Sequence, residues 1–362
     1  MSIIVSDLVE MQGWSQRSAT FEFELLNQDL DLLGLMEINA DAPPTIDNNS
    51  NRTVKRKLSG LNYHRNQAKE INMLSDRVKA WMVFSDGQRF PLGVFMFADP
   101  STARMTGGDQ VDVTLVDQGL MLDQATETTF SLAPGSKVID ALNERFNHRL
   151  IRNASIEASA TRTKGDEWAV WPAGTSDMDI INDLCAMAGF YSAYFDNSGI
   201  PICRSVPNLE NLEPLLSYET NTNVYADSII ETNDLLTAPN RYIVVNNGMT
   251  DMPVSGFWDI PDTAPHSIVN RRMVVTKVID SQAVADDAEA TNMARAAGLS
   301  DTDTYEKANF TAAINPRHDT FDIVGWDGKK YHEQSWSLTC RDGAGQRHEL
   351  RRVYTEITES VQ

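Results

Sequence analysis

The sequence predicts a β-dominated α+β protein, and two patterns carry this prediction. Short segments in which apolar and polar residues alternate, separated by turns that contain Gly or Asn, occupy the first and last parts of the chain. Helical patterns with one apolar face lie mainly between them. The 362 residues are 41% hydrophobic and 23% charged. This composition is ordinary for a soluble globular protein, and the length suits roughly two or three domains.

Residues 1–127 are expected to be strands. The segment Ser18 to Leu25 alternates Phe and Leu with Glu, which is typical of a strand with one buried face. The turn at 85–88 (SDGQ) follows one aromatic run and precedes another, so it predicts a hairpin. The polar, proline-containing stretch 40–51 is expected to be a long exposed loop. Other strands are expected at 32–38, 52–58, 78–84, 89–98 and 111–116.

Residues 128–214 are expected to form a small α/β unit with two helices and a hairpin. The first helix has Ser136 as its expected N-cap and an apolar face from Val138 to Phe146. The second begins at Ser176, which Asp179 follows three residues later, as in a capping box, and it ends at Gly189. The turn at 196–199 (DNSG) predicts the hairpin.

Residues 215–362 return to strands, with one alanine-rich helix among them. This helix is expected over 282–297, with acids near its start, Arg295 near its end and a stop at Gly298, an order that suits the helix dipole. The remaining short strands and Gly-containing turns favour a barrel or a sandwich. These strands are expected at 228–231, 241–246, 272–279, 308–314, 320–326, 331–341 and 348–358.

The formal net charge is −20, with 51 acidic against 31 basic residues. This balance argues against binding to nucleic acid and to anionic membranes, because both favour basic surfaces. It indicates either plain solubility or a surface that nucleic acid must pass without sticking. The chain has no long apolar run and no basic, apolar leader, so we expect synthesis in the cytoplasm and no membrane insertion.

No dense catalytic or metal-binding motif occurs, and we predict no catalytic, cofactor-binding or metal site. The motifs G-x-S-x-G, G-x-x-x-x-G-K-[ST], H-E-x-x-H and G-x-G-x-x-G are all missing from the sequence. The histidines lie too far apart in sequence for a local metal pair, and their expected positions are solvated or at an interface. The six are His64, His148, His266, His318, His332 and His348. The three cysteines, Cys185, Cys203 and Cys340, form no C-x-x-C pair and are expected to be buried and free.

Three weaker candidates have a structural and a chemical interpretation each. The carboxylates between Asp301 and Glu306 resemble a calcium loop but lack its glycine and its distal Glu, so a solvated connection is expected. Asp177, Asp179 and Asp183 allow acid chemistry, although acids at a helix start are stabilising on their own. Several tryptophans suit either sugar binding or the core, and the core or an interface is expected. They are Trp81, Trp168, Trp171, Trp326 and Trp336.

The order of several motifs resembles bacteriophage tail hub proteins, the baseplate hub or minor tail proteins of long-tailed phages. The motifs run through most of the chain: FSDG at 84–87, PLGVF at 91–95, VTLVDQG at 113–119, WPAGT at 171–175, YFDNSGIP at 194–201, NPRH at 315–318 and DIV at 322–324, followed by the Trp336 strand.

This resemblance implies two tail-tube-like β-barrel domains, at 1–127 and 215–362, with the α/β domain 128–214 inserted between them and the helix 282–297 inserted in the second. It also implies a virion protein whose three copies form a ring at the tail tip. Such a homotrimer joins the six-fold tail tube, or a distal tail protein, to a three-fold tip or spike, contacts the tape-measure protein, and surrounds the channel through which DNA leaves.

Two other functions are compatible with the sequence. The tryptophans allow a distal-tail or tip protein that binds host surface glycans. The many carboxylates allow a tail-associated lysin or glycosidase, although 51 acidic residues carry little information about any one pair.

Overall fold

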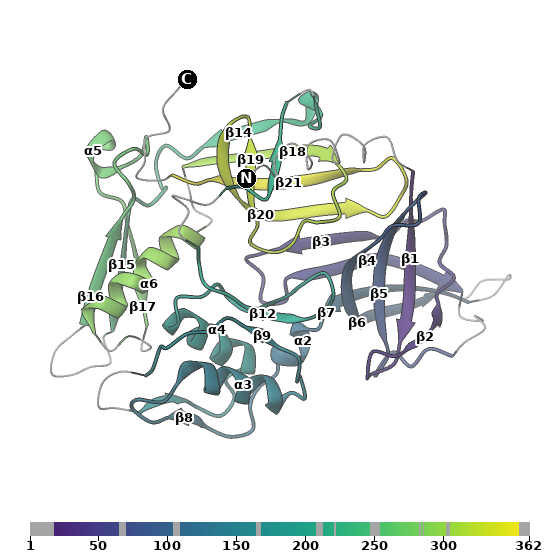
Figure 1. Ribbon diagram of the computed structural model, residues 1–362, viewed down its shortest axis with the longest axis horizontal. Helices are drawn as coiled ribbons and strands as arrows, with labels where there is room; N and C mark the ends of the chain where they lie inside the picture. The colour runs from purple at the N-terminus through teal and green to yellow at the C-terminus, as the bar shows by residue number, and fades with distance from the viewer. Residues whose placement is uncertain are drawn as a thin grey trace.

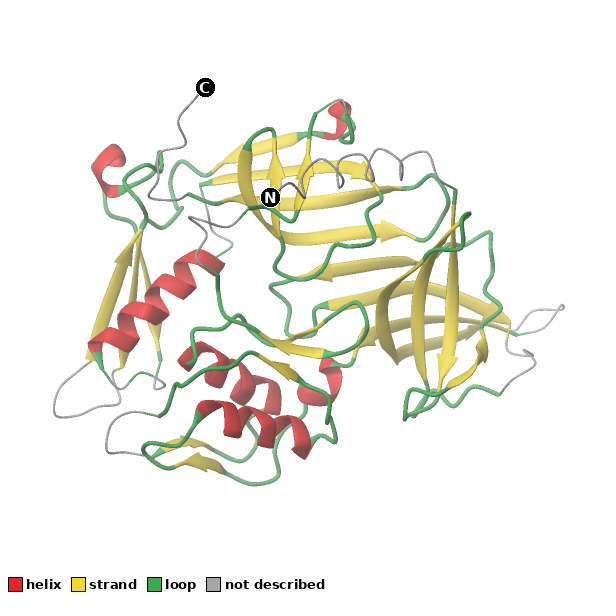
Figure 2. Ribbon diagram, in the orientation of Figure 1, coloured by secondary structure: helices red, strands yellow, loops and turns green. Residues whose placement is uncertain are grey.

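The computed structural model describes residues 18–64, 70–103, 109–163, 168–207, 213–220, 222–246, 254–281, 284, 286–301 and 305–354. Strands dominate it, as predicted: a 13-stranded sheet crosses the molecule, and three small sheets and a few helices lie beside it (Figures 1 and 2). Within the described ranges, no helix has the length and apolar character needed to cross a membrane.

Seven strands form what we call the first β unit. Its strands lie in the order β3-β4-β7-β6-β5-β1-β2. An isolated bridge from Ile38 to Tyr63 ties the segment after β2 back to β4. The strands are β1 (Ala19–Leu26), β2 (Leu32–Leu35), β3 (Thr45–Asn49), β4 (Arg56–His64), β5 (Arg77–Phe84), β6 (Arg89–Ala103) and β7 (Gln110–Asp117).

Six later strands form the second β unit, and their order repeats that of the first. They lie as β14-β18-β21-β20-β19-β13, which matches β3-β4-β7-β6-β5-β1 strand for strand in chain order. One pair differs, because β13 and β19 are parallel whereas β1 and β5 are antiparallel. The strands are β13 (Leu216–Tyr218), β14 (Ile230–Asn233), β18 (Glu306–Ala313), β19 (Ile323–Trp326), β20 (Lys329–Thr339) and β21 (Gly345–Arg352).

The two β units share one hydrophobic core cluster, and they are joined by antiparallel pairing of β3 with β20. The stretch 40–51 was expected to be an exposed loop, and this expectation is wrong for its central part. Residues 45–49 form β3, which lies between β4 and β20 in the middle of the sheet. Ile46 is 0% exposed, so one apolar side chain among polar neighbours is enough to anchor this strand when both edges are paired.

The segment between the β units forms the α/β insert, which has its own core cluster. Ser176 caps α4, since its hydroxyl accepts from the N–H of Asp179 as predicted. Ser136 is not a cap: α3 begins one residue later, with Lys137 at the N-cap position and no side-chain cap bond. The elements are α2 (Gly119–Leu122), β8 (Phe130–Leu132), α3 (Val138–His148), β9 (Ser155–Ile156), β10 (Ala169–Trp171), α4 (Asp177–Met187), β11 (Tyr194–Phe195) and β12 (Pro201–Cys203).

A second insert, which we call the helix insert, leaves the second β unit after β14 and returns at β18. Its long helix, α6, packs on a three-stranded sheet of order β16-β15-β17 (Figure 1). The elements are β15 (Arg241–Asn246), β16 (Val254–Asp259), α5 (Ile268–Arg271), β17 (Thr276–Asp280) and α6 (Asp287–Ser300), and a short 3-10 turn, η1 (Ala226–Ser228), precedes β14.

Helix α6 differs in its bounds from the helix expected over 282–297. It begins at Asp287 and continues past Gly298 to Ser300, while positions 282, 283 and 285 lie outside the described residues. Gly298 does not end the helix. Its missing side chain instead lets the helix pack closely on β16, since a Cβ at Gly298 would lie 2.4 Å from the Trp258 ring. Gly256 on β16 meets α6 in the same way, since a Cβ there would lie 2.2 Å from the backbone nitrogen of Thr291.

Candidate functional site

The joint between the two β units is a run of five cross-strand pairs, from Thr45 opposite Thr339 to Asn49 opposite Ser335. Ile46 and its partner Leu338 are both buried in the shared core. Pairing of this kind satisfies the backbone groups of two sheet edges that would otherwise be templates for other chains. The chain therefore joins its two β units edge to edge within itself.

Several strand edges lack a partner among the residues that the structure describes, and those of β14 and β6 are two of them. β14 pairs with β18 on one side, and all four of its residues are exposed. β6 pairs with β7 as far as Ala103, but its pairing with β5 ends at Met96. All residues of the segment 99–103 are exposed, and its other edge has no partner among the described residues. These two edges are candidate assembly surfaces.

A buried arginine ties the first β unit to the two parts of the chain that follow it. Arg56, at the start of β4, has a side chain only 1% exposed and forms an ion pair with Asp319 of the second β unit. It also donates from Nη1 to Asn197 Oδ1 of the α/β insert, over 2.5 Å. Asn197 in turn donates from Nδ2 to the carbonyl of His318, over 2.9 Å. One side chain thus links three parts of the fold.

The backbone of Arg56 is fixed by a second buried acid. Asp117, at the end of β7, accepts from the N–H of Arg56 at 2.6 Å and from the N–H of Gly119 at 2.7 Å. Burial raises the pKa of Asp117, although these two hydrogen bonds and the charge of Arg56 oppose the rise. Gly119 is needed because a Cβ there would lie 2.7 Å from the Asp117 carboxylate.

The segment between β18 and β19 packs against the α/β insert through the side chain of Phe321. Phe321 stacks on Tyr191, with ring centroids 4.4 Å apart, and Nζ of Lys55 lies over the Phe321 ring at 5.2 Å from its centroid. Arg204 donates to the carbonyls of Thr320 and Phe321. Burial, and next the nearby charge of Asp319, raise the pKa of Asp322 to about 7.

A buried His–Glu–His network lies on the other face of β20. Glu333 accepts from Nδ1 of His318 and from Nδ1 of His348, each at 2.6 Å. The Tyr218 hydroxyl lies 2.5 Å from Nε2 of His318, so it can donate to that nitrogen. Burial alone would raise the pKa of Glu333, but the two histidines lower it to about 2. Burial lowers the pKa of His348. Burial opposes a rise at His318 as well, but the charge and hydrogen bond of Glu333, together with the charges of Asp322 and Asp319, raise the pKa of His318.

These three side chains are also close enough to hold a divalent metal ion, since ligand atoms of all three lie within 4.8 Å of one another. Their chemistry suits such an ion, because imidazole and carboxylate are zinc ligands. The present geometry is that of a hydrogen-bond network, because each Nδ1 already donates to the carboxylate that a metal would need. The network links β20, β21 and the segment before β19.

The expectation that the histidines are solvated or at an interface is wrong for four of them: His266, His318, His332 and His348 are buried within the chain. Neighbouring side chains of β20 point to opposite faces, as in any strand, but both faces of β20 are covered. Glu333 faces the core of the second β unit. His332 lies near Tyr191 and Phe321, which stack on each other where the second β unit meets the α/β insert. Sequence periodicity could not show this, because a strand covered on both faces needs no polar side.

The acidic candidates have structural partners. Asp177 is 0% exposed and accepts from Arg149 at 2.5 Å and from His148 at 2.9 Å. Asp183 accepts from the Trp171 indole N–H at 2.8 Å. Asp301 pairs with Lys277 at 2.7 Å, and residues 302–304 lie outside the described part of the chain.

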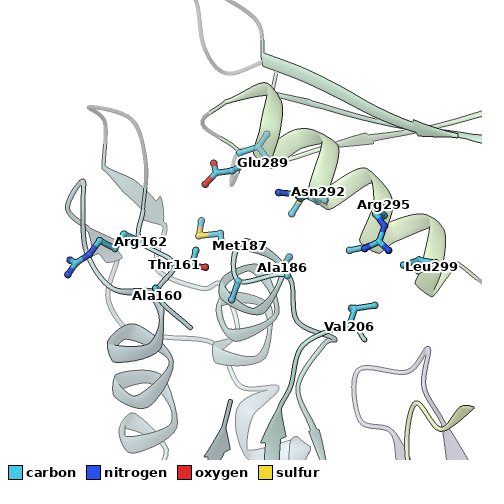
Figure 3. Close-up of a pocket in the computed structure, with 15 residues that line it drawn as sticks. Ala160, Thr161, Arg162, Ala186, Met187, Val206, Glu289, Asn292, Arg295 and Leu299 are labelled. Carbon is cyan, nitrogen blue, oxygen red and sulfur yellow. The ribbon is translucent and has the colours of Figure 1, made fainter. Parts of the chain in front are cut away.

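The tryptophan candidates are mostly packed, as expected. Trp171, Trp326 and Trp336 are buried, and Trp81 donates its indole N–H to Glu24, whereas Trp168 is 60% exposed. A cavity of about 480 Å³ lies between α4 and α6. Figure 3 shows Met187 and Arg162 on one side of it, with Asn292 and Arg295 of α6 on the other. Among the described residues that line it, none is aromatic.

No protein-family model and no curated protein match the sequence. Solved structures do match the fold, among them three tail proteins. A tail protein from Neisseria meningitidis has a TM-score of 0.59 at 11% identity, over 91% of this chain and 96% of that one. The 43 kDa tail protein of prophage MuSo2 from Shewanella oneidensis has a TM-score of 0.58 at 10% identity, over 92% and 98%. A prophage tail protein from Listeria monocytogenes has a TM-score of 0.56 at 10% identity, over 91% and 94%.

The matches extend over nearly the whole length of both chains in each comparison, so they include the two β units and both inserts rather than one local motif. At this level of identity the likeness concerns the fold. The chain therefore has the fold of phage tail proteins.

Proposed function

We propose that this chain is a structural virion protein that forms the trimeric hub of a phage tail tip or baseplate. The observation that carries the proposal is the internal repeat: one order of six strands occurs twice in a chain with the fold of phage tail proteins. Three copies contain six such units, which can match a six-fold tube on one side. The three copies as such match a three-fold tip on the other side.

In this proposal each β unit is a tail-tube-like barrel. The domains are 1–127 and 215–362, with 128–214 inserted between them. The bridge from Ile38 to Tyr63 supports a barrel in the first unit, because it brings the segment after β2 back to β4 across the sheet. The shared core and the β3–β20 joint would hold the two barrels of one chain at a fixed angle.

The charge of the chain suits a ring around a DNA channel. Three copies would carry three times the −20 charge of one chain. An acidic lining repels phosphate, so DNA would pass without specific binding. The partners in this proposal are other copies of the chain, the tail tube or a distal tail protein, the tip or spike, and the tape-measure protein. The protein would be made in the host cytoplasm and would act in the virion.

The mass and the symmetry of the assembled protein test this proposal. We expect the purified chain at high concentration, or the isolated tail particle, to show a complex of three chains of 40.3 kDa each. Native mass spectrometry measures the copy number, and particle images measure the symmetry. A complex with another copy number, or a particle in which this chain lacks three-fold symmetry, contradicts the proposal.

A second function, binding of host glycans by a distal-tail or tip protein, is supported by the exposure of Trp168. An exposed indole can stack on a sugar ring. Glycan-array binding that is lost on substitution of Trp168→Ala would favour this function. Trp171→Phe is a suitable comparison, because Trp171 is buried against Phe130 with ring centroids 5.5 Å apart.

A further inference from the structure

The internal repeat assigns a counterpart to each strand of the β3–β20 joint. In the strand order, β14 corresponds to β3, and β6 corresponds to β20. β20 has two kinds of neighbour along one edge: β19 pairs with its first part and β3 with its second part. β6 has the same first neighbour, since β5 corresponds to β19, but its second part has no partner among the described residues.

The ladders also agree in register. The β20–β21 ladder shifts between Glu333 and Ser335. The β6–β7 ladder shifts between Phe97 and Asp99. Superposing the two bulges makes Ser335 equivalent to Asp99, and the segment 335–339 equivalent to 99–103.

The equivalence of β14 with β3 follows from the same alignment. Lys307 of β18 pairs with Arg351, and Lys57 of β4 pairs with Val116. The bulge alignment makes Arg351 and Val116 equivalent, so Lys307 corresponds to Lys57.

The preceding residues then correspond as well. Asn233 pairs with Glu306, and Asn48 pairs with Arg56. Asn233 therefore takes the position of Asn48, and Ile230 takes the position of Thr45.

We infer that β14 of one copy pairs antiparallel with the free edge of β6 in the next copy, and so repeats between chains the joint that β3 and β20 make within one chain. The expected pairs are Asn233 with Pro100, Thr232 with Ser101, Glu231 with Thr102, and Ile230 with Ala103. This inference rests on the proposed ring of three copies. A contact between two different surfaces closes into a ring when its rotation allows, and here each chain offers one of each surface.

One feature of the strands suits edges that are free before assembly. At the pair formed by Glu231 and Thr102 the side chains are more polar than in the internal joint, because these two residues take the positions of Ile46 and Leu338. The free edges can therefore remain in water before assembly, whereas the internal joint is buried from the start.

Disulfide trapping tests the register. Directly opposed residues in antiparallel strands have Cα atoms about 4.5–5.5 Å apart, which a disulfide can bridge. We expect the variant S101C/T232C to form a covalent trimer as the main band on a non-reducing gel after mild oxidation. The three native cysteines are buried and free, so they do not compete at the surface.

Two matched variants control this experiment. D47C/S337C places the same pair in the internal joint, where Asp47 is opposite Ser337, and should cross-link within one chain. S101C/I230C is out of register by two residues, at about 7–8 Å, and should cross-link much less. Circular dichroism shows whether each variant is folded.

The outcomes separate this inference from the proposed function. A trimer that cross-links through S101C/T232C supports both. A trimer in which S101C/T232C cross-links no better than S101C/I230C contradicts the strand pairing and leaves the trimer intact. A wild-type chain without a trimer, alone or in particles, contradicts both.

If the cysteine variants do not fold, amide hydrogen exchange of the wild-type protein decides. Residues 230–233 and 99–103 should exchange more slowly in the trimer than in the diluted monomer. Equal exchange in the two states contradicts the pairing.

Discussion

The substitution Arg56→Met gives the sharpest test of how the three parts of the chain are held together. It removes a charge that is 1% exposed and leaves Asp319 without its ionic partner. Removing one member of a buried pair typically costs about 3–5 kcal/mol of the free energy of unfolding. The Asp319 side chain keeps 24% exposure and a 2.7 Å hydrogen bond from the Thr320 N–H. We therefore expect the lower end, about 3 kcal/mol.

The double variant Arg56→Met/Asp319→Asn separates the charge from the packing. It leaves no unpaired carboxylate, so we expect it to be more stable than Arg56→Met by about 2 kcal/mol. Acid should also relieve the single variant. Burial already raises the pKa of Asp319, and loss of Arg56 raises it further. The folded state then holds a proton more tightly than the unfolded chain, so the stability lost in Arg56→Met is regained as the pH falls through this pKa.

Urea unfolding followed by tryptophan fluorescence measures these differences, since Arg56 lies 5.9 Å from the Trp336 ring. The reasoning is refuted if Arg56→Met costs less than about 1 kcal/mol, as an exposed ion pair would. It is also refuted if the double variant is as unstable as the single one at neutral pH.

Three further predictions concern the core and the inserts. Burial and Asp319 raise the pKa of Asp322 from 3.8 to about 7. The free energy of unfolding should therefore fall as the pH rises between these two values, by about 4 kcal/mol in all at 1.36 kcal/mol per pKa unit. Asp322→Asn should flatten this pH dependence in thermal unfolding. Gly256→Ala places a Cβ 2.2 Å from the backbone of α6, so it should lower the free energy of unfolding by about 1–3 kcal/mol and speed amide exchange in α6. Ser255→Ala, at the exposed neighbouring position, should change neither the stability nor the exchange. Unchanged exchange in Gly256→Ala contradicts the close approach. Ser176→Ala should lower the free energy of unfolding by about 1 kcal/mol, because the α4 cap is lost. Ser136→Ala, at a position that caps no helix, should change it by no more than about 0.5 kcal/mol. Equal effects of the two substitutions in urea unfolding would contradict the assignment of the caps.

Local patterns predicted the elements that depend on local physics. The alternation of Ser18 to Leu25 forms β1, and the pairing of Ser176 with Asp179 caps α4. The stretch 40–51 was missed because β3 is held by two neighbouring strands, one of them almost 300 residues away in sequence. Composition in a short window carries no signal of such a partner.

The buried polar side chains were not predicted, for a related reason. Arg56, Asp319 and Glu333 have polar side chains that usually lie at the surface, and their burial is possible only because residues from distant segments compensate them. Alternation along a strand places His332 and Glu333 on opposite faces, but it carries no signal that both faces are covered. Gly298 shows the converse error, since a glycine expected to end a helix instead admits a tryptophan ring.

The helix insert leaves and rejoins the second β unit at two residues that are directly opposite each other, since Asn233 pairs with Glu306. At the equivalent place in the first β unit, a loop of six residues, 50–55, connects β3 to β4. A short turn is therefore sufficient to close this edge of the sheet, and the whole segment 234–305 is an addition at one hairpin. Such an addition can be lengthened, shortened or replaced without changing the strand order beneath it, so one scaffold can carry different outer surfaces.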